Sequence, residues 1–309
     1  MSYARSRDNL GKPMPIMTLQ FKLPSFYDLS ATCHAHGWRY LAPFNWDERR
    51  GAISFALLVN DHAVDVFACQ RRACLSAQVH SGAKLRESEK LYMRLCIKRV
   101  FDLDTDTTAL LVLANSIDKR LARLVKNGAG RMLRSPTAWE DAAKTLFTTN
   151  CSWSLTKKMA QSACSAGFAP VSPVGRFPFP LPTTIAALTE AHLKKRLPVG
   201  YRAGYLRRLA AAFSPEGSLH GVDLTRLGRL PAQTLLASLA GFGPYATNHM
   251  MLLSGYYREI PVDTVVTSYL KQMHRTRDVH KLIDKKYKAW GDYRWWGLTL
   301  EKMHQRIYG

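Results

Sequence analysis

Residues 239–266, LAGFGPYATNHMMLLSGYYREIPVDTVV, constrain the fold more than any other part of the sequence. Gly241 and Gly243 lie one residue apart between two apolar segments with helical spacing, so the chain must turn sharply between two helices. The second helix begins with unpaired N–H groups and the positive end of its dipole. The segment therefore predicts a helical hairpin over residues 231–255 that suits a phosphate, although an ordinary corner between two helices has the same pattern.

A single carboxylate follows the hairpin after a crossover at residues 256–264. Asp263 comes after Pro261 and directly precedes the helical segment TVVTSYLKQM, which places it at a helix N-cap. Capping alone explains an aspartate there. A carboxylate beside a phosphate-binding turn is nevertheless repelled by phosphate, and its placement makes sense if positive charge develops there during a reaction.

The charge of the chain points to a polyanion as its partner. Among 309 residues, 44 are Lys or Arg and 23 are Asp or Glu, a formal net charge of +21, and 47% are hydrophobic. A globular chain this basic favours nucleic acid. No apolar run reaches the ~18 residues of a membrane span, and the first residues have no signal-peptide core. The six cysteines form no CxxC pair, so we expect reduced thiols and no metal.

The pattern along the chain predicts an α+β protein. We expect a flexible basic tail at 1–16, an antiparallel sheet with a helix at 17–112, and a helical domain at 113–309. The runs ISFALLV, AVDVFAC and LSAQVHS are typical of strands. Single helices are expected over TALLVLANSIDKRLARLVKN, over PTTIAALTEAHLKKRL, and over SPTAWEDAAKTLFTT with Ser135 as its cap. The basic, aromatic C-terminal segment KLIDKKYKAWGDYRWWGLTLEKMHQRIY is also expected to be helical.

The glycine hairpin, helix, loop and "PVD" aspartate resemble the signature of the helix-hairpin-helix DNA glycosylases. Two further stretches are similar to the 8-oxoguanine branch: SPTAWEDAAKTLFTTNCSWSLTKKM and EAHLKKRLPVGYRAGYLRRLA. The resemblance covers residues 20–300. It implies a monomer that binds double-stranded DNA carrying a modified base, in the cytoplasm at a bacterial nucleoid or in a nucleus. No cofactor is implied, and a monovalent cation on the hairpin carbonyls is left open.

The resemblance also implies roles for particular residues. Asp263 would stabilise the oxocarbenium-like sugar and activate water. The base must leave the duplex first, and the gap would be filled by Tyr201 as the wedge, with Arg202 facing the orphaned base and Asn150 in the emptied stack. The expected contacts to the DNA backbone are Gly241, Gly243, Tyr245, Lys194, Lys195 and Arg207.

Tyr245 stands where members that cut the strand carry a lysine, and a phenol cannot form an imine. We therefore expect a monofunctional enzyme that uses water. His249, one helical turn later, is expected to contact the base or protonate it, unless it is a buried structural histidine. The residues expected to line the base pocket are Tyr245, His249, Trp153, Trp295, Trp296 and Leu298.

The substrate stays open at this level. Aromatic residues around the expected pocket tilt the prediction toward an alkylated or bulky modified base. An oxidised guanine and a hypermodified cytosine, as in defence against phage, are alternatives. A non-catalytic protein that binds DNA structure is the alternative from another class.

Overall fold

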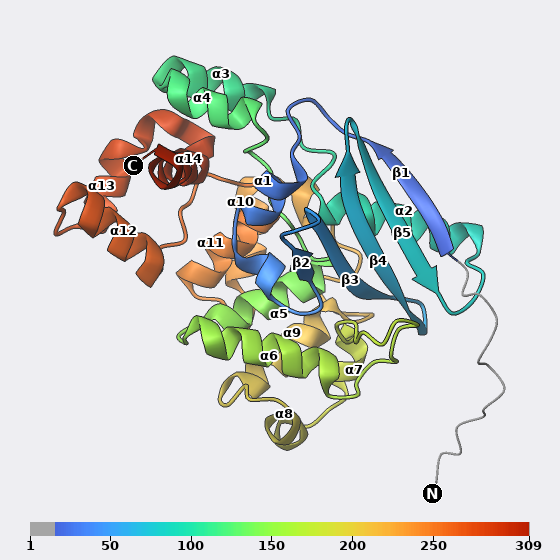
Figure 1. The fold of residues 1–309 in the computed structure, drawn as a ribbon. Coiled ribbons are helices and arrows are strands. Elements are labelled where there is room, and N and C mark those ends of the chain that lie inside the picture. The colour runs from blue at the N-terminus through green and yellow to red at the C-terminus, as the bar shows by residue number, and fades with distance from the viewer. Residues whose placement is uncertain (1–15, 309) are drawn as a thin grey trace, which may run out of the picture.

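The computed structural model describes residues 16–308, so the predicted basic tail lies outside the described residues except for Ile16, which opens the first strand. A five-stranded antiparallel sheet lies at one side of the helical part (Figure 1), in the order β1-β5-β4-β3-β2. The strands are β1 (Ile16–Lys22), β2 (Asn45–Asp47), β3 (Ala52–Val59), β4 (His62–Arg71) and β5 (Cys74–Ser81). The predicted α+β class is confirmed.

The three predicted strands form the middle of the sheet. Val59 pairs with His62 across a two-residue turn, in which Asn60 has a positive φ of 52°. Asparagine tolerates this left-handed conformation better than most residues, which explains the tight reversal. Helix α2 (Glu87–Val100) covers one face of the sheet with Met93, Ile97 and Val100, all of which are buried.

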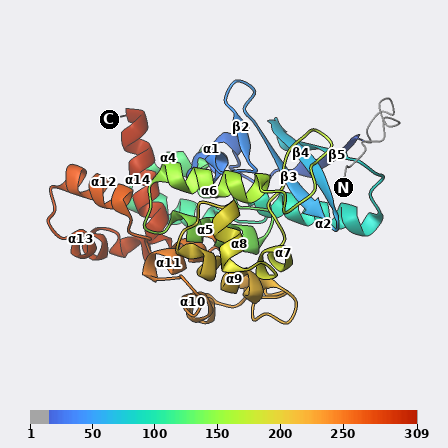
Figure 2. The same cartoon turned by 90° about the horizontal axis from the view of Figure 1, so that it is seen from below.

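Helices make up the rest of the described chain (Figure 2). They are α1 (Leu29–His34), η2 (Gly37–Tyr40), α3 (Thr108–Ile117), α4 (Lys119–Lys126), α5 (Ala138–Thr148), α6 (Trp153–Ser165), α7 (Pro182–Ala186), α8 (Glu190–Arg196), α9 (Arg202–Phe213), η3 (Leu224–Arg226), α10 (Arg229–Ala237), α11 (Pro244–Leu253), α12 (Thr264–His274), α13 (Val279–Lys286), η4 (Lys288–Tyr293) and α14 (Arg294–Tyr308). Among residues 16–308, none is long and apolar enough to cross a membrane.

Local hydrogen bonds divide two of the predicted helices and move the start of a third. Asp118 caps α4 and ends α3, and Thr189 caps α8 after α7. The cap of α5 is Thr137 instead of Ser135, whose backbone N–H donates to Asp141 in the core. Side chains of Asp, Ser and Thr compete with the helix for backbone N–H groups, and periodicity alone does not show which one succeeds.

The C-terminal segment and the domain boundary also differ from expectation. Gly291, with a φ of 53°, separates η4 from α14 within the stretch expected to be helical. The predicted boundary at residue 112 falls inside α3. Helices α3 and α4 pack against η4 and α14, and buried residues of the sheet and of the helices form one continuous hydrophobic cluster. The two regions therefore fold against a shared core.

Candidate functional site

The two glycines of the hairpin have different structural roles. Gly241 has a φ of 84°, and a Cβ there would lie 2.8 Å from Leu146 Cδ1 and 3.0 Å from Tyr205 Cγ. The turn is therefore pressed against α5 and α9 and needs glycine at this position. Gly243 is exposed, caps α11 with an ordinary φ of −82°, and has no atom near its missing side chain. Its open face leaves the first N–H groups of α11 accessible to an anion.

Asp263 caps α12, as predicted. Its Oδ1 accepts a hydrogen bond of 2.7 Å from Val266 N, and the residue is partly exposed. Within residues 16–308, Oδ2 accepts no hydrogen bond and the carboxylate forms no ion pair. The cap thus holds the side chain in place and leaves one oxygen free for other chemistry.

Tyr245 and Lys302 both lie within electrostatic reach of Asp263. Burial raises the pKa of the Tyr245 phenol, and the negative charge of Asp263 raises it further, so the hydroxyl stays protonated. Burial lowers the pKa of the Lys302 amine, and Asp263 opposes that shift. Lys302 Nζ lies 5.6 Å from the centre of the Tyr269 ring. The resemblance to the 8-oxoguanine branch aligns Leu298 and Lys302 with two positions that contact the base in that branch, but it did not predict that Lys302 lies within electrostatic reach of Asp263.

A cluster of packed rings continues from Tyr245 to residues of the N-terminal part. The rings of Tyr245 and His249 are 5.9 Å apart, and His249 stacks on Trp38 with centroids 4.9 Å apart and an interplanar angle of 21°. The His36 ring is 6.2 Å from His249. Trp38 and His36 belong to η2 and its N-cap. No motif indicated these two residues, since they are about 210 positions from His249.

Trp153 packs against the segment that carries His36 and Trp38. Its indole packs on Gly37, where a Cβ would lie only 2.6 Å from Cη2 of the ring, and the residue is 40% exposed. The structure therefore brings three of the predicted pocket residues together, namely Tyr245, His249 and Trp153. They lie beside Asp263, His36 and Trp38.

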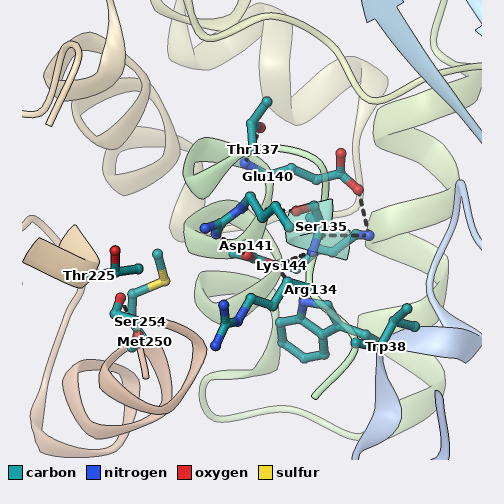
Figure 3. Close-up of polar contacts among 12 residues, drawn as sticks. Trp38, Arg134, Ser135, Thr137, Glu140, Asp141, Lys144, Thr225, Met250 and Ser254 are labelled. Atoms are coloured by element: carbon teal, nitrogen blue, oxygen red, sulfur yellow. Dashed lines mark hydrogen bonds and ion pairs between the residues drawn. The ribbon is translucent and has the colours of Figure 1, made fainter. Parts of the chain in front are cut away.

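A buried polar network holds Trp38 in position (Figure 3). Asp141 accepts hydrogen bonds from Trp38 Nε1 and Ser135 N, both 2.8 Å, and pairs with Arg99 at 2.7 Å. Beside it, Lys144 Nζ lies 2.6 Å from Glu140 Oε1. Both partners of this second pair are buried, and their charges compensate each other. The indole that supports His249 is thus fixed by hydrogen bonding as well as by packing.

Three other predicted pocket residues are core residues. Trp296 and Leu298 are 0% and 1% exposed, and Trp295 stacks on Tyr257 and packs edge-on against Trp296 at 4.6 Å. The prediction that these residues line a pocket is therefore wrong for this structure. The aromatic segment forms the buried stripe of α14, which leaves no ring face for a base.

The predicted wedge residues divide into two kinds. Tyr201 is 58% exposed at the start of α9, and Asn150 is exposed with a φ of 47°. Arg202 is only 4% exposed, and its guanidinium donates to the carbonyls of Thr149 and Asn150. Arg202 therefore does not point outward, as a contact to an orphaned base requires. It holds the Asn150 loop beside Tyr201.

Three of the six expected backbone contacts are exposed cations. Lys194 and Lys195 lie on α8 and Arg207 lies on α9. Arg207 Nε donates to Ala186 O at 3.4 Å, which leaves its charge uncompensated. In the described part of the chain, no cluster of three His, Cys, Asp or Glu side chains is arranged to hold a metal ion.

Comparison with known proteins places the fold in a class. No family model and no curated protein matches the sequence. A Clostridium acetobutylicum 8-oxoguanine glycosylase/lyase, bound to double-stranded DNA with cytosine opposite 8-oxoguanine, matches 94% of this chain and 99% of its own with a TM-score of 0.67 and 18% identity. The 3-methyladenine DNA glycosylase of Archaeoglobus fulgidus matches 94% and 99% with a TM-score of 0.71 and 15% identity. The chain has the fold of the helix-hairpin-helix DNA glycosylases, as the hairpin and the PVD segment predicted.

Proposed function

We propose that this protein is a DNA glycosylase that turns a modified base out of the duplex and hydrolyses its N-glycosidic bond. The observation that carries the proposal is Asp263, a partly exposed carboxylate with a free oxygen, held beside Tyr245 at the first turn of the hairpin's second helix. The proteins of similar fold are an 8-oxoguanine glycosylase/lyase and a 3-methyladenine glycosylase, which supports the same class of reaction here.

Asp263 supplies the charge that the reaction requires. As the bond from C1′ to the base breaks, the sugar becomes oxocarbenium-like, and a carboxylate close to C1′ stabilises that cation. The free Oδ2 accepts a proton from the attacking water, whose oxygen bonds to C1′ while the bonding electrons leave with the base. Tyr245 remains a neutral phenol and serves as a hydrogen-bond donor beside the sugar.

Base eversion depends on the exposed pair Tyr201 and Asn150. Turning a base out costs a few kcal/mol, and side chains that enter the gap offset part of this cost. Arg202 keeps the Asn150 loop in its left-handed conformation, so that both side chains project from neighbouring elements. The cations on α8 and α9 neutralise phosphates on either side of the lesion without reading sequence.

We infer that the enzyme is monofunctional. Tyr245 has no amine, and strand cleavage by β-elimination needs an imine between an amine and C1′. Lys302 is the other candidate for the attacking nucleophile, since it lies within electrostatic reach of Asp263. Burial lowers the pKa of its amine and the charge of Asp263 opposes that shift, so Lys302 is the amine that a trapping experiment must test. Tyr245 occupies the position where the resemblance implies the attacking lysine of strand-cutting members. Water is therefore the proposed nucleophile.

The substrate we favour is an alkylated or bulky modified base. Stacking depends on Tyr245 and Trp153, because Trp295 and Trp296 are in the core. Oxidised guanine and hypermodified cytosine remain the alternatives to be included in the assay.

A panel of duplexes tests the activity. Each duplex carries one modified base, among them 8-oxoguanine, 7-methylguanine, ethenoadenine, 5-hydroxymethylcytosine and glucosylated 5-hydroxymethylcytosine. It is incubated with the full chain and then treated with alkali to cut any abasic site. We expect cleavage of at least one alkylated or bulky base of the panel. A wild-type chain that binds every duplex and cuts none would identify a non-catalytic DNA-structure binder.

Asp263→Asn separates charge from capping. Asparagine caps helices about as well as aspartate, so stability stays unchanged. Losing a charge about 4 Å from the sugar costs about 4 kcal/mol at an effective dielectric constant of 20, which is about a thousandfold in rate. Asp263→Ala is the matched variant that loses the cap as well. Equal activity of Asp263→Asn and wild type would refute the assigned role.

Borohydride trapping tests the choice of nucleophile. We expect no covalent adduct between wild-type protein and substrate duplex. An adduct that disappears in Lys302→Met would show instead that this amine attacks C1′, and the enzyme would then be a lyase as well.

A further inference from the structure

A corner between two of the last helices carries a large share of the positive charge of the protein. Residues 271–288 run from the end of α12 through α13 to the start of η4. They contain seven Lys or Arg and two Asp, a net charge of +5 in 18 residues, whereas the whole chain has +21 in 309. The charge per residue is thus about four times the average of the chain, and the proposed catalytic and base-turning steps do not use it.

Most of these cations are exposed and have no acidic partner. Among residues 16–308, six of the seven form no ion pair, namely Lys271, Arg275, Arg277, Lys281, Lys285 and Lys288. Both aspartates of the corner are engaged, because Asp278 caps α13 and Asp284 pairs with Arg294 at 2.6 Å. Like charges one turn apart, such as Lys281 and Lys285, destabilise a helix. An anion bound at the corner relieves this repulsion.

A single carboxylate of α14 holds the corner together. Oε1 of Glu301 accepts hydrogen bonds from His274 at 2.8 Å and Tyr269 at 3.2 Å, both in α12. Oε2 accepts one from Tyr287 at 3.1 Å and pairs with Lys286 at 3.1 Å, both at the end of α13. The two helices are therefore fixed to the same residue. Cations on such a rigid frame lose less conformational freedom on binding than those of a loose loop.

The position of the corner relative to Asp263 determines which part of a duplex it can reach. Helix α12 starts directly after Asp263 and has 11 residues, so at about 1.5 Å per residue its far end lies about 16 Å away. Phosphates on one strand follow each other at about 3.4 Å along the duplex axis, so this distance equals about five base pairs. The corner lies on the side of the helical part away from the sheet (Figures 1 and 2). Once a nucleotide is engaged at Asp263, the flanking backbone is the nearest polyanion.

We propose that the corner of α12 and α13 binds the phosphate backbone of the same duplex, about five base pairs to one side of the everted nucleotide. The contact positions the protein and reads no sequence. It lengthens the footprint on one flank only, because the corner lies at one end of α12. This inference rests on the proposed glycosylase function, which sets the position of the lesion, and adds a second interface.

Duplexes trimmed on one side test the contact. The probe is a long duplex with a tetrahydrofuran abasic analogue at its centre, which fixes the register without excision. Two further duplexes have one or the other flank cut to about three base pairs, short of the proposed contact. Fluorescence anisotropy gives the affinities of the double variant Lys281→Gln, Lys285→Gln. The matched control is Lys22→Gln, Lys84→Gln, two exposed positions beside the sheet.

We expect the corner variant to bind the long duplex at least fivefold more weakly than the control variant does. The slope of log K against log salt should fall by about two, because two phosphate contacts are lost. The fivefold loss should persist when one flank is trimmed and vanish when the other is trimmed.

Two results would overturn this inference. One is equal affinity of the two variants for the long duplex, and the other is the same outcome with both trimmed duplexes, since the cations then act only through net charge. A loss seen with single-stranded RNA and with none of the duplexes would assign the corner to RNA instead. Because the measurement is of binding, the contact is decided even if wild type cuts no base of the panel, which would count against the proposed activity alone.

Discussion

Substitutions at the two hairpin glycines should affect different properties, and the structure supplies the magnitudes. Gly241→Ala forces a non-glycine residue to a φ of 84°, which costs about 1–2 kcal/mol. The new Cβ also meets Tyr205 at 3.0 Å and Leu146 at 2.8 Å, and overpacking of this kind costs about 1–3 kcal/mol. The sum is about 2–5 kcal/mol, or about 4–10 °C in Tm for a protein of this size.

Gly243→Asp should leave the fold intact and weaken DNA binding. Its φ of −82° suits any residue, no atom lies within 4 Å of the new Cβ, and aspartate is a favoured N-cap. If a phosphate occupies the N-terminus of α11, a charge there repels it by about 1–4 kcal/mol at 4 Å, depending on the effective dielectric constant. Affinity should fall at least fivefold.

Thermal unfolding and fluorescence anisotropy with an undamaged duplex give the two measurements. Ser88→Asp at the exposed start of α2, beside the sheet, controls for the change in net charge. The reasoning is refuted if Gly241→Ala unfolds at the wild-type temperature. It is equally refuted if Gly243→Asp and Ser88→Asp bind DNA with the same affinity, because the hairpin then contacts no phosphate.

Three further predictions concern the interior of the site. Asp141→Ala should lower the free energy of unfolding by about 3–5 kcal/mol, because it leaves buried donors and Arg99 unpaired. Denaturant titration measures this loss, and Asp141→Asn is the milder variant for comparison. Arg202→Met should release the Asn150 loop and slow excision about tenfold, while stopped-flow binding to undamaged duplex stays unchanged. Burial lowers the pKa of His36 to about 4 and of His249 to about 3. The unfolded chain therefore takes up these protons first, and unfolding free energy should fall below about pH 6.5 by up to about 1.4 kcal/mol per pH unit for each histidine. Urea titrations at pH 7 and 5, with a double Asn variant that lacks this slope, measure the effect.

Local patterns were sufficient for the elements and the motif. Alternating residues predicted β3, β4 and β5, and the glycines with Asp263 predicted the hairpin and the cap, because these features depend on neighbours within a few positions. The helix breaks at Asp118 and Thr189 were missed. At these positions the side chain competes for backbone hydrogen bonds. The sequence contains several residues of this kind, and their local pattern does not show which of them caps a helix.

The aromatic residues show most clearly that burial could not be predicted from the sequence. The sequence contains Trp153, Trp295 and Trp296 with no sign of which face the core, and the fold buries the last two while leaving Trp153 over Gly37. Likewise, a conspicuous arginine after Tyr201 is buried against the Asn150 loop. Burial depends on which helices pack together, and that is a property of the whole chain.

By itself the sequence determined a basic α+β chain with a glycine hairpin and one well-placed carboxylate, since composition, turn chemistry and capping are local. Only the tertiary structure decided what surrounds that carboxylate. It brings Lys302 from the last helix to Asp263, and His36 and Trp38 from the first 40 residues to His249. Such contacts arise from long-range packing, and the hydrophobic pattern of a segment does not show which other segment it packs against.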